Sequence, residues 1–185
     1  MDARAWKRGF GAWIVSPIRG VLRDMNELLD TVRGPVLLAA TVATGLQAGT
    51  YYTWACGVMP GLARADDRTL VATMQSVNIA IVNPIFMLTF IGAPLLAAVA
   101  AATSGQTARP WVVAGLTLAV STVVITGVGN IPLNNALDAA GLVDRIVDLT
   151  TVRADFESTW VRWNLARALT STTSLACLTW AALSS

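Results

Sequence analysis

Long apolar stretches separated by short polar breaks dominate the chain. Residues 35–58, 70–103 and 111–128 carry no charged side chain, and residues 156–183 carry only Glu157, Arg162 and Arg167. A transmembrane helix needs roughly 20 mostly apolar residues. The pattern therefore predicts an all-α fold, a four-transmembrane-helix bundle with spans at about 35–58, 70–103, 111–128 and 156–183.

Prolines and glycines predict where the first two spans begin, bend and end. Pro35 is expected at the start of the first span, where its missing N–H costs little, and Met59-Pro60-Gly61 at its end. The second apolar stretch would extend ~50 Å as one helix, so we expect a kink at Pro84. Gly45 and Gly49, four residues apart, predict close packing against a neighbouring helix.

The last two spans are bounded by polar segments. Gly127 and Gly129 are expected to end the third span, and Asp155 is expected to N-cap the fourth. Residues 136–154 would connect them and include a short surface helix, because apolar and charged residues alternate there at helical spacing.

The first 34 residues form a basic amphipathic arm rather than a span. Apolar residues at helical spacing face a polar side that includes Arg23, Asp24, Glu27 and Asp30. We therefore expect residues 1–34 to lie along the headgroup region as an interfacial helix, and residues 35–185 to form the membrane domain. The apolar stripe comprises Trp6, Phe10, Trp13, Ile14, Val21, Leu22, Met25, Leu28, Leu29 and Val32.

Composition agrees with a chain that lies mostly in lipid. Of 185 residues, 55% are hydrophobic and only 13% are charged, and the mean hydropathy is +0.59. A net charge of +2 without a dense Lys/Arg run argues against a nucleic-acid partner. The chain has no histidine, which excludes His-ligated haem, His-based metal sites and His acid–base catalysis within it.

The distribution of Lys and Arg predicts the orientation in the membrane. Seven basic residues lie in the arm and in the turn at 104–110, against four in the connections on the other side. Basic residues favour the cytoplasmic face. We expect an integral, multi-pass plasma-membrane protein whose N- and C-termini are both cytoplasmic.

Strongly polar side chains inside apolar helices are the clearest candidates for function. An Arg at the centre of a span costs ~2.5–3.5 kcal/mol, so Arg167 should face the bundle interior or a wet cavity. Trp160, Asn164, Arg167 and Ser171 share one stripe of a helix. The polar set is Gln75, Asn78, Asn83, Asn130, Asn134, Asn164 and Arg167. It predicts a pocket that opens toward the outer face, or alternatively polar contacts that only hold the helices together.

Soluble-enzyme signatures are lacking: the chain has no Walker loop, no dinucleotide fingerprint after a strand and no His for a triad. No metal site or bound cofactor is evident. Asp66 and Asp67, just before the second span, are expected as the N-cap and first-turn acid of that helix.

A series of short motifs resembles the anthrone oxygenase family. The resemblance covers about residues 44–176. It rests on Gly45-Leu-Gln-Ala-Gly49 with Tyr51, Val58-Met-Pro-Gly-Leu62, Met74-Gln-Ser-Val-Asn78, Asn83-Pro-Ile-Phe86, Phe90-Ile-Gly92, Asn130-Ile-Pro-Leu-Asn134, and Trp160 with Trp163-Asn164 and Arg167.

This resemblance implies a four-helix membrane protein and, from characterised fungal members, oxidation of an anthrone by O₂ as co-substrate. Arg167, Asn164 and Asn78 would then be catalytic, with Arg167 stabilising an enolate-type anion. Without histidine, the base is Asp66, Asp67, Asp155, Glu157 or the substrate's own acidity. Substrate-binding roles are expected for Gln75, Asn83, Asn130, Asn134, Trp160, Trp163 and Tyr51.

Two functional classes therefore remain open. The first is an oxygenase-like oxidoreductase that acts on a lipid-soluble anthrone- or quinol-like aromatic. The second is a non-enzymatic membrane protein, either a module that binds lipid or a small molecule or an accessory subunit of a membrane complex. A transporter is disfavoured, because four spans without a detectable inverted repeat make a small scaffold.

Overall fold

The structure is a computed structural model that describes the backbone of residues 3–184 and the side chains of residues 20–184 other than 22 and 26. The apolar positions Trp6, Phe10, Trp13, Ile14 and Leu22 of the expected amphipathic stripe lie outside the described side chains. No strand occurs in residues 3–184, so the predicted all-α class is confirmed for this part of the chain.

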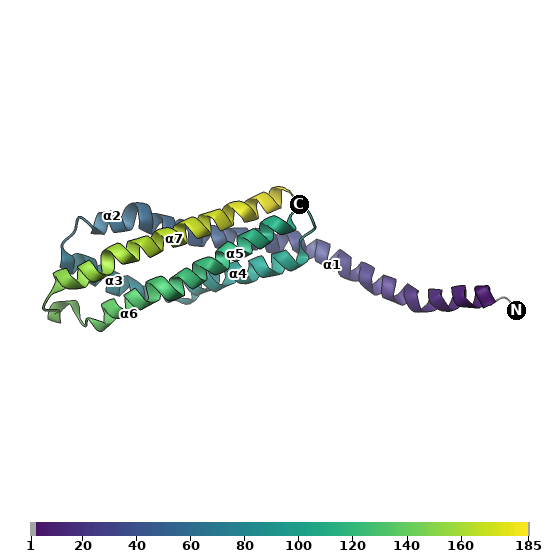
Figure 1. The fold of residues 1–185 in the computed structure, drawn as a ribbon, viewed down its shortest axis with the longest axis horizontal. Coiled ribbons are helices and arrows are strands. Elements are labelled where there is room, and N and C mark those ends of the chain that lie inside the picture. Colours follow the sequence, from purple (N-terminus) through teal and green to yellow (C-terminus); the bar gives the residue numbers. More distant parts are fainter. Residues whose placement is uncertain (1–2, 185) are drawn as a thin grey trace.

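Four long helices run alternately up and down and form a closed bundle (Figure 1). α1 and α5 each contact both α4 and α7, so the helices surround a common interior. The C-terminus lies beside the point at which α1 leaves the bundle, which puts it at the same end as the arm. The four helices are α1 (Ala3–Thr53), α4 (Pro84–Thr103), α5 (Arg109–Ile125) and α7 (Leu149–Leu183).

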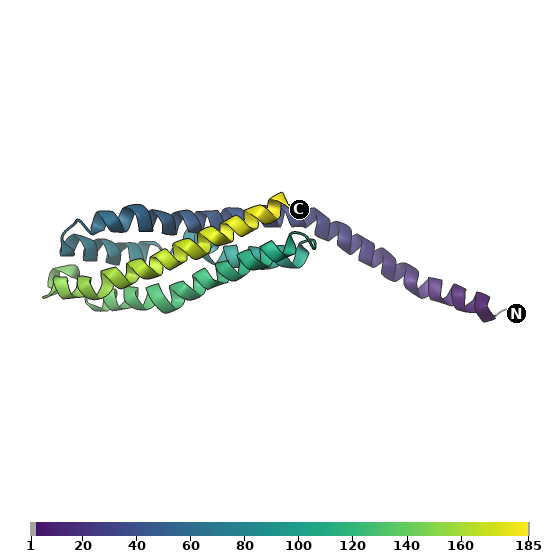
Figure 2. The same cartoon turned by 45° about the horizontal axis from the view of Figure 1, so that its top comes forward.

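The N-terminal arm and the first expected span form one uninterrupted helix, α1, which projects beyond the bundle (Figure 2). The expected helix start at Pro35 is therefore wrong. Proline removes the hydrogen bond to the carbonyl of Thr31 four residues earlier, but Thr31 is exposed and water can replace that donor. Arg33 ties α1 to the bundle, because its Nε donates to the Thr103 carbonyl oxygen at 2.7 Å.

Two π-helical turns carry helices past Pro60, which was expected to end the first span, and past Gly127 and Gly129, which were expected to end the third. The π-turn η1 (Trp54–Val58) leads into α2 (Met59–Leu62), and the π-turn η2 (Thr126–Asn130) leads into α6 (Ile131–Ala139). In each, the N–H of the residue before the proline bonds to a carbonyl five residues back, Met59 to Trp54 and Ile131 to Thr126. The stop predicted at Met59-Pro60-Gly61 lies within one residue of the end of α2 at Leu62. The predicted end at 128 is wrong, since the helix continues to Ala139, because the wider turn accommodates a residue without an N–H.

The second expected span is two helices, α3 (Asp67–Ala80) and α4, separated by Ile81–Asn83. The predicted bend at Pro84 is thus in the right place, but it is a full break. Asn83 caps α4, because its Oδ1 accepts from the N–H groups of Ile85 and Phe86. Its Nδ2 donates to the Ala80 carbonyl oxygen at 2.9 Å, so both helix ends are satisfied by one side chain.

The fourth helix begins earlier than predicted. α7 starts at Leu149 with Asp148 as its N-cap, and Asp155 lies inside the helix rather than capping it. Asp148 accepts from both the N–H and the hydroxyl of Thr151, a stronger cap than Asp155 could form. The expected surface helix in 136–154 is reduced to the 3₁₀ turn η3 (Val143–Arg145), whereas Asp66 is confirmed as the N-cap of α3.

Small residues let the helices approach closely. One buried cluster, at the end near the C-terminus, is rich in alanine and includes Ala40, Ala97 and Ala100. A Cβ added at Gly115 would lie 2.9 Å from Leu178, and one at Gly129 would lie 2.3 Å from Trp163. The predicted contact through Gly45 and Gly49 is wrong for Gly49, where an added Cβ would meet nothing within 4 Å. The glycines that require close packing are therefore on α5 and η2 rather than on α1.

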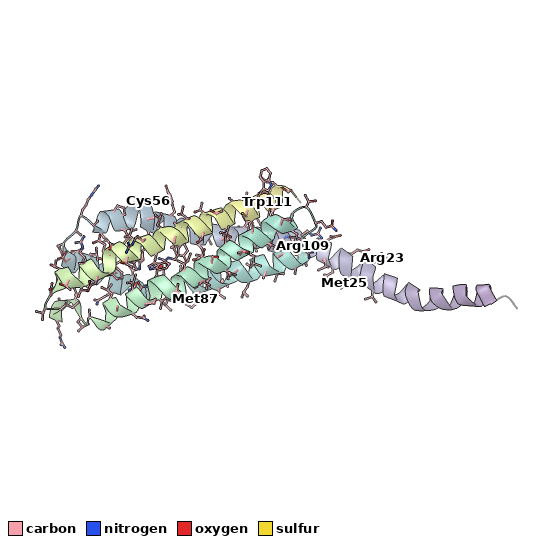
Figure 3. The ribbon with its side chains drawn as sticks, in the orientation of Figure 1. Arg23, Met25, Cys56, Met87, Arg109 and Trp111 are labelled. Carbon is pink, nitrogen blue, oxygen red and sulfur yellow. The ribbon has the colours of Figure 1, made fainter. Side chains whose placement is uncertain are left out.

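Two of the described helices, Pro84–Thr103 and the continuous segment Arg109–Ala139, are long and apolar enough to cross a membrane. Only a minority of the residues in their most apolar stretches are buried inside the bundle, and side chains radiate outward along both (Figure 3). The first and fourth expected spans do not meet the same criterion. These are the helices that carry Gln47, Asn164 and Arg167, all of which are buried.

A polar clamp closes the bundle end opposite the termini. Arg153 donates to the carbonyl oxygens of Ala63 and Ala65 and to the carboxylates of Asp67 and Glu157. The pKa of the Asp67 carboxyl lies below its usual value, because the Thr150 hydroxyl donates to it and because Arg153 does so as well. This end of the bundle therefore depends on ionised carboxylates.

The clamp predicts how stability depends on pH. A depressed folded pKa contributes stability that is fully present above the unfolded value, about 3.9 for Asp, and is lost as the pH falls through the folded pKa. We expect the melting temperature to decrease when the pH is lowered below ~4. This decrease should be smaller in Thr150→Val than in the parent protein, because that variant lacks the main hydrogen bond to Asp67. Thr117→Val, which removes only a bond to the carbonyl of its own helix, is the control. Equal acid sensitivity of Thr150→Val and the parent would contradict the assignment.

Candidate functional site

A polar-lined cavity inside the bundle has a volume of about 280 Å³ and lies among α1, α3, α4, α6 and α7. Five polar side chains line it together with several aromatic rings, and they are Thr50, Asn78, Thr126, Asn134 and Arg167. Met74 and Trp160 belong both to its wall and to the buried cluster at the clamp end.

Irregular backbone surrounds this cavity. Trp54 begins the π-turn η1, Ile81 and Val82 form the break between α3 and α4, and Thr126 begins the π-turn η2, and all four line the space. Such departures from the α-helix prevent the helices from packing flush, and they concentrate at functional sites. The cavity is therefore a consequence of the two π-turns and the helix break.

Arg167 is the only charged side chain that lines the cavity among the described residues, and it is only 8% exposed. Its guanidinium carbon lies 4.5 Å from the centre of the Tyr51 ring and 5.4 Å from that of Trp160. In the described part of the chain it forms no ion pair with a carboxylate. The cavity thus carries one uncompensated positive charge between two aromatic faces.

Asn164 fixes the position of this guanidinium. Its Oδ1 accepts from Nη2 of Arg167 at 2.9 Å, and its Nδ2 donates to the main-chain carbonyl oxygen of Tyr51 at 3.1 Å. Both hydrogen bonds are buried. Because the side chain links α7 to α1 and is not itself among the lining residues, Asn164 positions Arg167 from behind.

Two buried donors at the cavity have no hydrogen-bond partner, Nε of Arg167 and Nδ2 of Asn78. Leaving a buried donor unpaired costs about 1–3 kcal/mol, and more when the group is charged. Both residues line the same cavity, one from α7 and one from α3. Each donor is of a kind that binds an oxygen atom carrying negative charge.

Aromatic rings form part of the remaining walls, beside Met, Val and Ile side chains. Trp54 and Trp160 meet edge to face with ring centres 5.4 Å apart, and Phe86 and Phe90 stack at 5.7 Å. Nε1 of Trp160 donates to Oδ1 of Asn134 at 2.9 Å, which holds the indole in place. The arrangement offers a slot for a flat ring system, with its polar contacts at Arg167 and Asn78.

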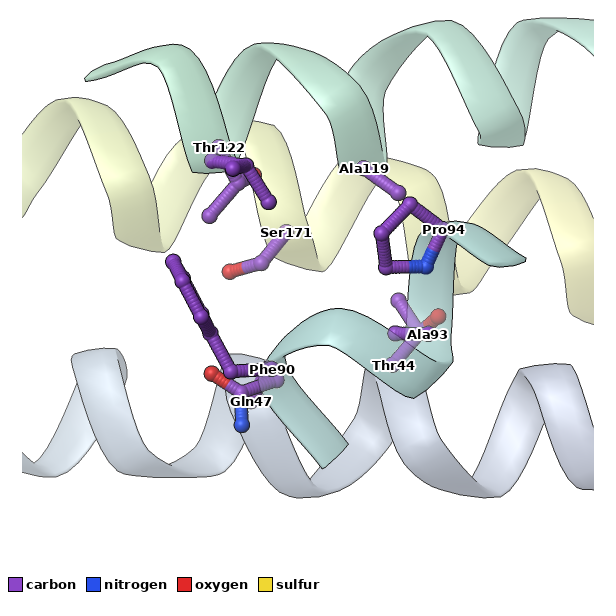
Figure 4. A pocket seen from close by; sticks show the side chains of 9 residues that line it. Thr44, Gln47, Phe90, Ala93, Pro94, Ala119, Thr122 and Ser171 are labelled. Atoms are coloured by element: carbon purple, nitrogen blue, oxygen red, sulfur yellow. The ribbon is translucent and has the colours of Figure 1, made fainter. Parts of the chain in front are cut away.

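A chain of hydrogen bonds between α1 and α4 holds Tyr51. The Tyr51 hydroxyl donates to Oε1 of Gln47 at 2.8 Å, and Nε2 of Gln47 donates to the Thr89 hydroxyl at 2.7 Å. Gln47 also lines a second, much smaller space of about 10 Å³ where α1, α4, α5 and α7 face one another (Figure 4). Phe90 lines both spaces, so it forms the partition between them.

The sequence-predicted site residues divide into three groups. Arg167, Asn78, Asn134, Trp160 and Tyr51 line the cavity, and Asn164 contacts Arg167 from behind. The remaining four serve other parts of the bundle and do not line the cavity. Gln75 donates to the carbonyls of Leu137 and Gly141, Asn83 caps α4, Asn130 donates to the Trp160 carbonyl oxygen, and Trp163 lies against Gly129.

None of the carboxylates proposed as a base lines the cavity. Asp66 caps α3, Asp67 and Glu157 pair with Arg153, and Asp155 lines a different space between α6 and α7. Sequence reasoning also missed Trp54, Phe86, Phe90 and Thr126 as wall residues. Trp54 follows Tyr51 by three residues on the same helix face, which is the one signal that could have indicated it.

A comparison with protein families gives a match to the model of Anthrone oxygenase over residues 72–177, more than half of the chain. The chain belongs to the anthrone oxygenase family. The predicted resemblance is thereby confirmed. No curated protein and no solved structure matches the chain. The matched region of this family member contains Asn78, Asn134, Trp160 and Arg167, whereas Tyr51 and Trp54 precede it.

Because Arg167 has no carboxylate partner in the described residues, the effect of replacing it on the free energy of unfolding can be predicted. Burying a cation costs several kcal/mol, whereas two ring contacts return ~0.5–2 kcal/mol each and the Asn164 bond ~1.5–3 kcal/mol. We therefore expect Arg167→Met to change the free energy of unfolding, measured in mixed micelles without ligand, by less than ~1 kcal/mol. A loss of ~3 kcal/mol or more would mean that Arg167 holds the helices together instead.

Proposed function

We propose that this family member is a multi-pass membrane protein whose four long helices span the bilayer, with the Arg167 cavity inside the hydrocarbon region. The mostly unburied apolar surfaces of α4 and α5 support this, because such surface is stable in lipid and costly in water. Gln47 of α1 and Asn164 and Arg167 of α7 are buried in the bundle, where lipid does not reach them. We place the termini in the cytoplasm of a plasma-membrane protein, on the same charge asymmetry as above.

We further propose that the protein uses this cavity to oxidise a flat, lipid-soluble aromatic of the anthrone or quinol type with O₂. The observation that supports this most is the pair of unpaired donors, Arg167 Nε and Asn78 Nδ2, in an aromatic-walled space. Preorganised donors stabilise a developing oxyanion more than they stabilise the neutral ground state. The site is thus complementary to the enolate of an anthrone rather than to the anthrone itself.

The proposed reaction has a simple balance. Loss of a proton from the ring methylene gives the enolate, whose oxygen Arg167 and Asn78 hold. The carbanionic carbon donates electrons to O₂ and forms a C–O bond, and protonation gives a hydroperoxide. The hydroperoxide loses water as its O–O bond breaks, which leaves a carbonyl. Overall, one CH₂ and one O₂ become one C=O and one H₂O, with O₂ as the only oxidant.

The residue roles follow from their positions. Arg167 and Asn78 contact the oxyanion, Asn164 orients Arg167, and Trp160 and Tyr51 face the rings. Since no carboxylate lines the cavity in the described residues, we assign the loss of the proton to the substrate's own acidity, which Arg167 increases. Asn134 contributes by holding Trp160.

A second function is favoured by the same lack of a base at the cavity. A site with an oxyanion clamp and aromatic walls, but no acid–base group beyond a tyrosine, is also suited to binding an aromatic anion without turnover. The two functions differ only in whether O₂ is consumed.

Oxygen uptake distinguishes them. We expect the protein in nanodiscs to accelerate the oxidation of a hydroxyanthrone above the rate in empty discs, and Arg167→Met to lower that acceleration by about 10²–10³. Asn78→Leu should reduce it less, since it removes a neutral donor. The control is Arg162→Met on the same helix, because Arg162 is exposed and bonds only to Thr159. Oxidation no faster than in empty discs would leave binding as the function.

A further inference from the structure

Several residues that line the cavity also form the outer surface of the bundle. Val82 is 72% exposed, Ile131 is 45% exposed and Met87 is 37% exposed, although all three line the space that contains Arg167. Met87 lies at the outer edge of the bundle (Figure 3). The cavity therefore reaches the side of the bundle between the α3–α4 break and the start of α6.

We infer that this lateral gap, with Val82, Met87 and Ile131 at its rim, is a portal through which the ligand passes directly between the lipid and the cavity. The inference rests on the proposed membrane-embedded site. It defines the ligand as a flat aromatic that dissolves in the bilayer and carries its polar group on one edge.

The rim has the chemistry that lipid requires. Val82, Met87 and Ile131 are all apolar, and no charged residue lines the cavity on that side in the described chain. Two of the three N–H groups of the break are satisfied internally, since Ile81 N–H bonds to Val77 and Asn83 N–H to Ile81. Irregular backbone at membrane depth is tolerated where it lines a cavity, and Ile81 and Val82 line this one.

The two ends of the bundle do not offer an equivalent route. Toward the clamp, Leu70, Leu137 and Phe156 fill the interior and are each almost fully buried. Toward the termini, Ala97, Ala100 and Leu178 do the same. A ligand that arrived from water along the bundle axis would have to displace one of these clusters, whereas the lateral gap needs no repacking.

Polarity increases from the rim to the interior. The rim is apolar, the middle is aromatic, and the inner wall holds Tyr51, which is 2% exposed, and Arg167. A ligand that enters ring first from the lipid would leave its oxygen at the apolar rim, whereas one that enters oxygen first brings that oxygen to the wall formed by Arg167 and Asn78. The portal thus selects ligands with the oxygen on the leading edge and an unsubstituted, apolar trailing edge.

Stopped-flow binding to the full-length protein in nanodiscs tests the portal, with a dihydroxyanthraquinone as the probe and its own fluorescence as the signal. We expect Val82→Trp and Ile131→Trp to slow association and dissociation alike, by about tenfold or more, while the dissociation constant changes little. Leu88→Trp is the matched control, since Leu88 is 75% exposed on α4 but does not line the cavity.

A sulfonated anthraquinone that cannot dissolve in the bilayer should associate far more slowly than the parent probe. Unchanged rates in both Trp variants, or equal rates for the sulfonated and parent probes, would overturn the portal while leaving any measured oxygenase activity in place. Slowed probe binding without anthrone oxidation would support the portal and refute the oxygenase function. The two failures are therefore distinguishable.

Discussion

The character of the cavity depends on Arg167, a buried guanidinium that has no counterion among the described residues. A cation taken out of water is costly, and proteins usually compensate it with a carboxylate. Arg167 instead has two aromatic faces, one amide oxygen and one donor left free. Each of these contacts lowers the cost without cancelling the charge. The protein therefore keeps a positive potential at the inner wall of the cavity, and the charge of an anionic ligand can neutralise it.

The backbone around Arg167 supplies both its partners and its space. Asn164 reaches the carbonyl oxygen of Tyr51 on α1, just before the π-turn η1, and so couples the guanidinium to the neighbouring helix. The second π-turn brings Gly129 against Trp163, where any larger side chain would collide with the indole. Two prolines that would end ordinary helices are thus accommodated by turns that also shape the cavity.

Sequence reasoning identified the site residues whose grouping depends on a single helix. It missed the features of the site that depend on how several helices pack together. Trp160, Asn164 and Arg167 fall on one stripe, so their grouping follows from helical periodicity alone. Gln75 and Asn83 carry a side-chain amide as Asn78 does, but their amides satisfy carbonyls at helix ends whose positions the sequence does not reveal. The π-turns were read as helix ends, because whether a proline stops a helix depends on how the preceding turn is packed. Wall residues such as Phe86 resemble any other apolar residue in a lipid-exposed helix.

The most direct test of the central claim is the ionisation of a bound hydroxyanthraquinone, followed by its visible absorption across a pH series in protein-containing and empty nanodiscs. If Arg167 is a free cation at the ligand's oxygen, the bound phenol should ionise at least about one pH unit lower than in empty discs. That shift should disappear in Arg167→Met and persist in Arg162→Met. Ionisation of the bound probe at the same pH as in empty discs, or at a higher one, would contradict the account.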